Sequence, residues 1–247
     1  VLSAAHCFDE DQDGQVDPVL GFFSHEIVFE LADGLVAIEY ELDSIQWPDA
    51  WPTSWVDVAV VTLAADAPAS VPRYPLYGAT DEVGQPLVLV SYGNPGYGST
   101  GEGSEAQPTK RAGLNRCEAI RDDYVGVDFL AYDFDSGLPA NNALALTGFE
   151  SDLGCGADEV FPASGDSGGP SFINGTIAGV TSFIARLSEA DVTSDTDSSW
   201  GEAGFDLFIL AESHAGGEAL LMMILVSAVA CFHRCRRAER VSKLVSA

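Results

Sequence analysis

Short stretches of alternating apolar and polar residues run through most of the chain, and glycine, proline, asparagine or aspartate bounds each stretch. This alternation is typical of strands that bury one face. It predicts eight strands: His25–Leu31, Leu35–Leu42, Val56–Leu63, Pro86–Tyr92, Phe129–Phe134, Ser171–Ile173, Thr176–Ile184 and Phe205–Ile209. Because amphipathic helical periodicity is almost absent from residues 1–209, an all-β barrel or sandwich is expected.

Turn chemistry divides these strands. Asn174-Gly175 stands between two apolar runs and predicts a two-residue hairpin turn. Asp66–Tyr77 contains three prolines and reads as a connector between two halves of the fold. Gly93–Thr109 is rich in glycine and predicts a long flexible loop.

Composition and charge narrow the functional classes. The chain has 247 residues, of which 47% are hydrophobic, so it can bury a sizeable core. The 11 Lys and Arg residues face 38 Asp and Glu residues, a net charge of −27. A body this acidic repels phosphate backbones, which excludes nucleic acid as a partner.

Three short segments carry the candidate chemistry. Val1–Cys7 reads VLSAAHC, Val56–Leu63 reads VDVAVVTL and Gly165–Pro170 reads GDSGGP. They contribute a histidine, an aspartate and a serine in that order. A serine hydroxyl is a poor nucleophile at neutral pH, and a histidine held by a carboxylate can accept its proton during attack. Together the segments resemble the trypsin/chymotrypsin family of serine endopeptidases, over about residues 1–209.

The resemblance implies a role for each of these residues. Ser167 would be the nucleophile, His6 the general base, and Asp57 the group that orients the imidazole. The backbone amides of Gly165 and Ser167 would form the oxyanion hole. The implied fold is two antiparallel six-stranded Greek-key barrels, and we expect the opening strands of the first barrel to precede Val1.

Activation and specificity are also implied by the resemblance. Asp166 would pair with the new N-terminal amine of an activated enzyme. The substrate side-chain pocket would involve Phe161, Ser182, Phe183, Ile184 and Gly204. No carboxylate is obvious at the pocket floor and Ile184 would narrow its mouth, so we expect a preference for small or apolar side chains over Arg or Lys.

An acidic loop follows the histidine segment. Asp9, Asp11 and Asp13, followed by Gly14, match the first half of an EF-hand-like calcium loop, and Asp17 offers a further carboxylate. Position 12 of such a loop is Leu20 rather than glutamate, so a solvated acidic surface loop is the competing interpretation. The peptidase chemistry itself requires no cofactor, and calcium is an optional addition.

Five cysteines leave the redox compartment open: Cys7, Cys117, Cys155, Cys231 and Cys235. Cys117 and Cys155 could form a disulfide in an oxidising compartment, and Cys7 would need a partner upstream of Val1.

The end of the chain differs in character from the body. Ala219–Phe232 is apolar except for Ser227, follows Gly216-Gly217 and precedes an arginine cluster. As a helix it would span roughly 21 Å, less than the ~30 Å hydrocarbon core. The pattern resembles the sorting tails of some bacterial secreted proteases, and we favour a membrane anchor or processed tail over a buried core helix.

The resulting assignment is a secreted or cell-surface serine endopeptidase acting on polypeptides. Its expected parts are a first barrel (1–76), a second barrel (77–210), a linker (211–218), an apolar anchor or sorting helix (219–233) and a basic tail (234–247). The alternative is a membrane-tethered, calcium-dependent binding module on a scaffold whose triad is dormant.

Overall fold

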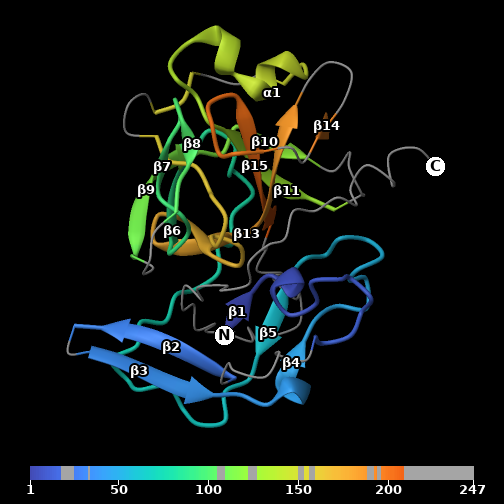
Figure 1. Cartoon of the computed structure of the whole chain (residues 1–247), viewed down its shortest axis with the longest axis vertical. Helices are drawn as coiled ribbons and strands as arrows, with labels where there is room; N and C mark the ends of the chain where they lie inside the picture. Colours follow the sequence, from blue (N-terminus) through green and yellow to red (C-terminus); the bar gives the residue numbers. More distant parts are fainter. Residues whose placement is uncertain are drawn as a thin grey trace.

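The computed structural model describes residues 1–17, 25–32, 34–104, 109–121, 127–149, 153–155, 159–187, 192–193 and 196–208. Within these residues the chain is mostly β, as the sequence predicts (Figure 1). The helical elements there are short: η1 (Ala5–Cys7), η2 (Leu42–Ser44), η3 (Pro139–Asn141) and α1 (Ala143–Leu146).

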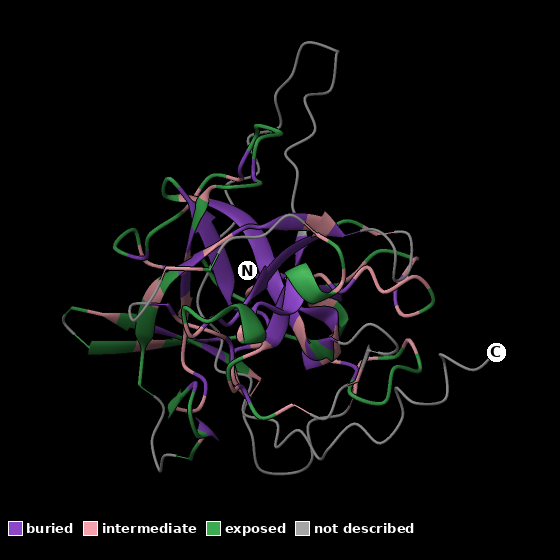
Figure 2. Cartoon of the chain, turned by 90° about the horizontal axis from the view of Figure 1, so that it is seen from above, coloured by how far each residue is buried: buried purple, intermediate pink, exposed green. Residues whose placement is uncertain are grey.

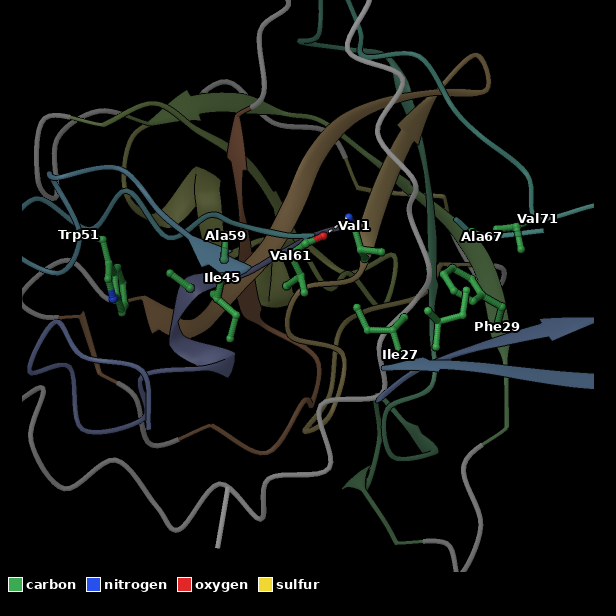
Figure 3. Close-up of a cluster of buried hydrophobic side chains, with 11 residues drawn as sticks. Val1, Ile27, Phe29, Ile45, Trp51, Ala59, Val61, Ala67 and Val71 are labelled. Atoms are coloured by element: carbon green, nitrogen blue, oxygen red, sulfur yellow. Dashed lines mark hydrogen bonds between the residues drawn. The ribbon is translucent and has the colours of Figure 1, made fainter. Parts of the chain in front are cut away.

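A small sheet and a hairpin form the first half of the structure. The sheet has the order β1-β5-β4, from β1 (Leu2–Ser3), β5 (Ala59–Val61) and β4 (Ile45–Gln46). The hairpin pairs β2 (Glu26–Leu31) with β3 (Gly34–Glu39). Their buried side chains share one apolar cluster that includes Ile27, Phe29, Ile45, Trp51 and Val61 (Figure 3).

An antiparallel eight-stranded sheet forms the second half. Its order is β10-β11-β15-β13-β12-β6-β9, with β14 paired to β13. The strands are β6 (Pro86–Ser91), β9 (Arg111–Arg116), β10 (Ala119–Arg121), β11 (Phe129–Asp133), β12 (Pro170–Ile173), β13 (Thr176–Leu187), β14 (Val192–Thr193) and β15 (Glu202–Phe208). The long central strands β11, β13 and β15 are themselves largely buried, as the purple strands in Figure 2 show.

A separate apolar cluster joins the two halves. Leu2, Ala4 and Cys7 of the first half pack in it with Phe172 and Val180 of the second. Burying apolar side chains from both sides removes them from water, and this ties the position of β1 to that of β12 and β13.

The proline-rich connector is ordered. Tyr77 donates its N–H to the carbonyl of Ile177 at 2.7 Å, and Ile177 donates back to Pro75 at 2.9 Å. The connector therefore adds a short bridge to β13 on its way from one half to the other.

The strand predictions are confirmed with changed ends. All eight predicted strands occur, and β13 extends past Ile184 to Leu187. The predicted hairpin turn is also confirmed, because Asn174 and Gly175 have φ of 50° and 79°, the left-handed values that a two-residue turn of this kind needs. The segment predicted as a flexible loop contains a small hairpin, β7 (Gly96–Tyr97) with β8 (Gly101–Glu102).

The remaining large-scale predictions are not decided by these sheets. Among the described residues the strands group into sheets of eight, three, two and two, and the proposed domain boundaries stay predictions. The apolar segment 219–233 and the basic tail lie outside the described residues. Within the described part of the chain, no helix has the length and apolar character that crossing a membrane requires.

Candidate active site

His6 and Asp57 are brought together by the small sheet. His6 lies in η1, directly after β1, and Asp57 lies two residues before β5, the strand that pairs with β1. His6 Nδ1 is 2.7 Å from Asp57 Oδ2, and the backbone N–H of His6 donates to Asp57 Oδ1 at 2.9 Å. The carboxylate therefore holds both the ring and the backbone of the histidine, which fixes the ring's orientation.

The Asp57 carboxylate is buried yet charged. Asp57 is only 2% exposed to solvent. Burial alone would raise the pKa of Asp57, but the charge of His6 and hydrogen bonds from His6 and Ser182 outweigh burial and lower the pKa below its ordinary value. A charged carboxylate on Nδ1 favours the tautomer that leaves Nε2 as the proton acceptor.

Ser182 has a role that the sequence analysis did not assign. Its hydroxyl lies 2.5 Å from Asp57 Oδ2, where it donates a hydrogen bond to the oxygen that also contacts His6. The sequence analysis placed Ser182 in the substrate pocket. Only the fold shows that β13 turns this side chain toward Asp57, because the two residues are 125 positions apart.

Ser167 lies in a turn that is fastened at several points. Gly168 N–H donates to Thr181 at 2.8 Å, and Thr181 N–H donates back to Gly169 at 2.8 Å. A Cβ added to Gly168 would lie 2.3 Å from Ser3 Oγ and 3.0 Å from the backbone nitrogen of Ala4. The turn that carries Ser167 is thus packed against the two residues that precede η1, next to His6.

The turn leaves two donors unused. Among the described residues, the backbone N–H groups of Gly165 and Ser167 have no acceptor, whereas those of Asp166, Gly168 and Gly169 all do. The Ser167 hydroxyl likewise makes no hydrogen bond to any described group, His6 included. The structure therefore brings the histidine and aspartate into contact and places the serine turn beside them without a serine–histidine hydrogen bond.

Asp166 points away from Ser167 into the second half. Its carboxylate accepts hydrogen bonds from the N–H groups of Gly93 at 2.5 Å and Ala163 at 2.8 Å. Burial raises the pKa of Asp166, although these bonds, a contact with Ser91 and the charge of Arg111 lower it in part. The Asp166 carboxylate therefore accepts hydrogen bonds from backbone amides. The resemblance implies an N-terminal amine as its partner instead.

The predicted pocket residues do not form one group. Phe161 stacks on Phe134 and borders a cavity of about 390 Å³ that Asp166, Arg111 and Thr181 also line. In the described structure the other four predicted residues, Ser182, Phe183, Ile184 and Gly204, do not line this cavity.

Phe183 and Ile184 lie instead along the β13–β15 pair. The ring of Phe183 stacks on Phe205 with centroids 4.7 Å apart. Ile184 is the cross-strand partner of Gly204, where Tyr132 fills the space of a side chain.

The four aspartates of the acidic loop are held largely by the loop itself. Asp9 is fully buried and accepts hydrogen bonds from Trp51 Nε1 at 2.8 Å and from the N–H groups of Asp13 and Gly14, each at 3.0 Å. Asp13 accepts from the N–H of Gln15, and Asp17 from that of Glu10. Carboxylate oxygens of Asp9, Asp11 and Asp17 lie within 4.8 Å of one another, and Asp13 is not in this group. Calcium binding here stays a prediction.

The cysteines form no disulfide among the described residues. Cys7 and Cys117 are buried and Cys155 is half-buried. Burial and nearby carboxylates raise the pKa of the Cys117 thiol to about 12, so it is protonated and unreactive at neutral pH. Cys231 and Cys235 lie outside the described residues.

Comparisons with known proteins give structural similarity alone. No protein-family model and no curated protein matches the sequence. Solved structures similar to the chain include neuropsin, a serine protease expressed in the limbic system of mouse brain, with 16% identity over 84% of this chain and 78% of that one, and a TM-score of 0.49. Human heparin binding protein has 17% identity over 84% of this chain and 76% of that one, with a TM-score of 0.45. At this level of similarity, the function has to be argued from this chain's own residues.

Proposed function

We propose that this chain is a serine endopeptidase that hydrolyses peptide bonds through an acyl-enzyme. The observation that carries the proposal is the partly buried contact between His6 Nδ1 and Asp57 Oδ2 at 2.7 Å, beside the turn that presents Ser167. A histidine oriented by a charged carboxylate next to a serine on a tight turn is the arrangement that general-base activation of a hydroxyl requires.

In the proposed mechanism, Ser167 Oγ attacks the carbonyl carbon of the scissile bond while His6 Nε2 takes the hydroxyl proton. The imidazolium is stabilised by Asp57 and then gives the proton to the departing amine, so the peptide C–N bond breaks and an ester to Ser167 remains. Water, deprotonated by His6, hydrolyses the ester and restores the hydroxyl.

Two backbone N–H groups in the Ser167 turn support the proposed oxyanion hole. The N–H groups of Gly165 and Ser167 have no acceptor among the described residues. Two such donors would bind the oxyanion of the tetrahedral intermediate.

The wider proposal keeps the remaining sequence predictions. We propose that the two halves are the antiparallel barrels of a chymotrypsin-type enzyme, that the protein is secreted or held at the cell surface by its C-terminal segment, and that it prefers small or apolar side chains next to the scissile bond. The substrate is a polypeptide and the chemistry needs no cofactor.

One observation favours the second candidate, a binding module with a dormant triad. The Ser167 hydroxyl makes no hydrogen bond to His6 within the described structure. In resting enzymes this contact is often long and tightens only when substrate binds, so we rank the peptidase first.

Covalent labelling distinguishes the two candidates. A fluorophosphonate probe should label the full-length protein and leave the Ser167→Ala variant unlabelled, and both should be tested before and after limited proteolysis. Cleavage of a peptide library by the same samples would identify the preferred side chain. No labelling under either condition, in a folded protein, would reject the peptidase and leave the binding module.

A further inference from the structure

Three carboxylates meet at the far end of the second half, near α1. Glu118 immediately precedes β10, Asp133 ends β11, and Asp135 follows two residues later. Because alternate residues of an extended chain share a face, Asp133 and Asp135 point to the same side. Each of the three side chains places an oxygen within 4.8 Å of the other two.

These carboxylates are buried. Asp133 and Asp135 are each 1% exposed and Glu118 is 6% exposed. Burying charge costs free energy unless nearby groups compensate it, and three like charges in one place add mutual repulsion. Burial, together with the negative charge of Glu118 and Asp135, raises the pKa of Asp133 to about 9.

Asp133 has one oxygen free for a ligand. Its Oδ2 accepts the N–H of Leu144, the second residue of α1, at 2.9 Å. Its Oδ1 is fully buried and has no hydrogen-bond partner in the described part of the chain. A buried oxygen of this kind is rare in folded proteins and points to a missing partner.

The neighbouring Glu159 is a buried carboxylate for comparison, because both of its oxygens accept backbone hydrogen bonds. Glu159 Oε2 accepts the N–H of Asp135 at 2.6 Å, and Oε1 accepts the N–H of Cys155 at 3.1 Å. Gly154 leaves room for it, since an added Cβ would lie 2.3 Å from Oε1. Backbone donors are thus arranged around both oxygens of Glu159, but only around one oxygen of Asp133.

We propose that Glu118, Asp133 and Asp135 form a binding site for a calcium ion. Carboxylate oxygens are the ligands that hard divalent cations prefer, and no histidine or cysteine belongs to this group to favour zinc. Calcium binds oxygens at about 2.3–2.6 Å, so two ligands on opposite sides of one ion are about 4.6–5.2 Å apart. The three carboxylate oxygens lie within 4.8 Å of one another, which is close enough for all of them to contact one calcium ion.

The ion would join three elements that lie close together in the chain. It would tie the start of β10 to the end of β11, and through Leu144 it would fix the start of α1. In Figure 1, α1 lies at the opposite end of the molecule from β1, so the expected effect of the ion is on stability.

Calcium titration of full-length protein tests the site. The reference protein carries Ser167→Ala to prevent self-cleavage and Asp11→Asn to remove a ligand from the acidic loop. After chelation, isothermal titration with CaCl₂ should show one binding event, and Tm should rise by roughly 5–10 °C at a hundredfold excess over Kd.

Adding Asp133→Asn should abolish both the binding heat and the Tm shift. Asparagine keeps the shape and the oxygen that accepts from Leu144. Without calcium this variant should melt above the reference at neutral pH, because asparagine is buried uncharged without having to bind a proton. Glu118→Gln is the second variant, in case Asp133→Asn does not fold. No calcium heat in the reference at millimolar concentration, or equal heat in the folded variants, would overturn the proposal in favour of a protonated carboxylate cluster.

Discussion

Ser182 and His6 both hydrogen-bond to Oδ2 of Asp57, at 2.5 and 2.7 Å. Ser182 lies on β13 and Asp57 lies just before β5, so this oxygen connects the two halves. Because both contacts lower the pKa of Asp57, Ser182 helps to keep the carboxylate charged where burial would otherwise favour its protonation.

Asp57→Asn should reduce kcat by about 10⁴-fold with little change in KM. The amide would present an N–H to His6 Nδ1 and favour the tautomer that cannot accept the Ser167 proton. Steady-state hydrolysis of a peptide substrate measures the loss. Asp43→Asn, at an exposed position, is the matched control and should retain full activity. Equal rates in the two variants would contradict the role given to Asp57.

Ser182→Ala should have a smaller effect, a fall in kcat of roughly 10- to 100-fold. A hydrogen bond to a charged group contributes about 1.5–3 kcal/mol, and removing it leaves His6 as the remaining side-chain donor to Asp57. The pH dependence of kcat should also change, with activity lost at a higher pH on the acid side. If Ser182→Ala altered KM alone, Ser182 would belong to substrate binding, as the sequence analysis first placed it.

Gly168→Ala should lose at least tenfold in activity, because the new methyl group would collide with Ser3 and Ala4 and displace the Ser167 turn. Gly175→Ala is a sensitive control. Gly168 and Gly175 both have φ of 79°, so both substitutions carry the same backbone strain, but nothing lies within 4 Å of a Cβ at Gly175. Gly175→Ala should therefore lower Tm and leave kcat unchanged. Similar activity in the two variants would show that contact with Ser3 does not position the nucleophile.

Asp206→Asn should change the pH dependence of stability. Burial raises the pKa of Asp206 from 3.8 to about 6, against a hydrogen bond from Tyr132 that lowers it. The folded state therefore binds the proton more tightly than the unfolded chain, and stability falls as pH rises from about 4 to 6, by about 3 kcal/mol at most.

Asparagine is uncharged throughout this range. The Asp206→Asn variant should melt above the wild type at pH 7.5 and close to it at pH 4, in thermal unfolding followed by circular dichroism. Asp43→Asn should follow the wild type at both values. A constant Tm difference between the Asp206 variant and wild type across this range would argue against a raised pKa.

The strands were predictable where alternation was strong, and missed where it was weak. β9 reads RAGLNR, and its residues are largely exposed because it lies at the edge of the sheet next to β6. An edge strand needs little apolar surface, so its sequence resembles that of a loop. β10, with three residues, is too short to show a period.

Only the site residues that belong to short sequence motifs could be predicted from the sequence. His6 and Asp57 were found from their local sequence, and the structure brings them into contact. The role of Ser182 and the grouping of Glu118 with Asp133 depend on pairings of β13 and β11 that no local pattern encodes. The substrate pocket stays a prediction, and the register shift between Thr181 and Phe183 is a further feature of β13 that the sequence pattern does not show.

Because an apolar cluster joins the two halves, the chain could be expressed as two separate fragments whose association restores activity. Residues 1–63 contain the proposed base His6 and the proposed acid Asp57, residues 86–208 contain the proposed nucleophile Ser167, and the connector 66–77 lies between them. Neither fragment alone would hold a complete triad. Peptide hydrolysis would resume only when the two fragments associate and Gly168 packs against Ser3 again. The rate of hydrolysis would therefore be proportional to the concentration of reassembled protein.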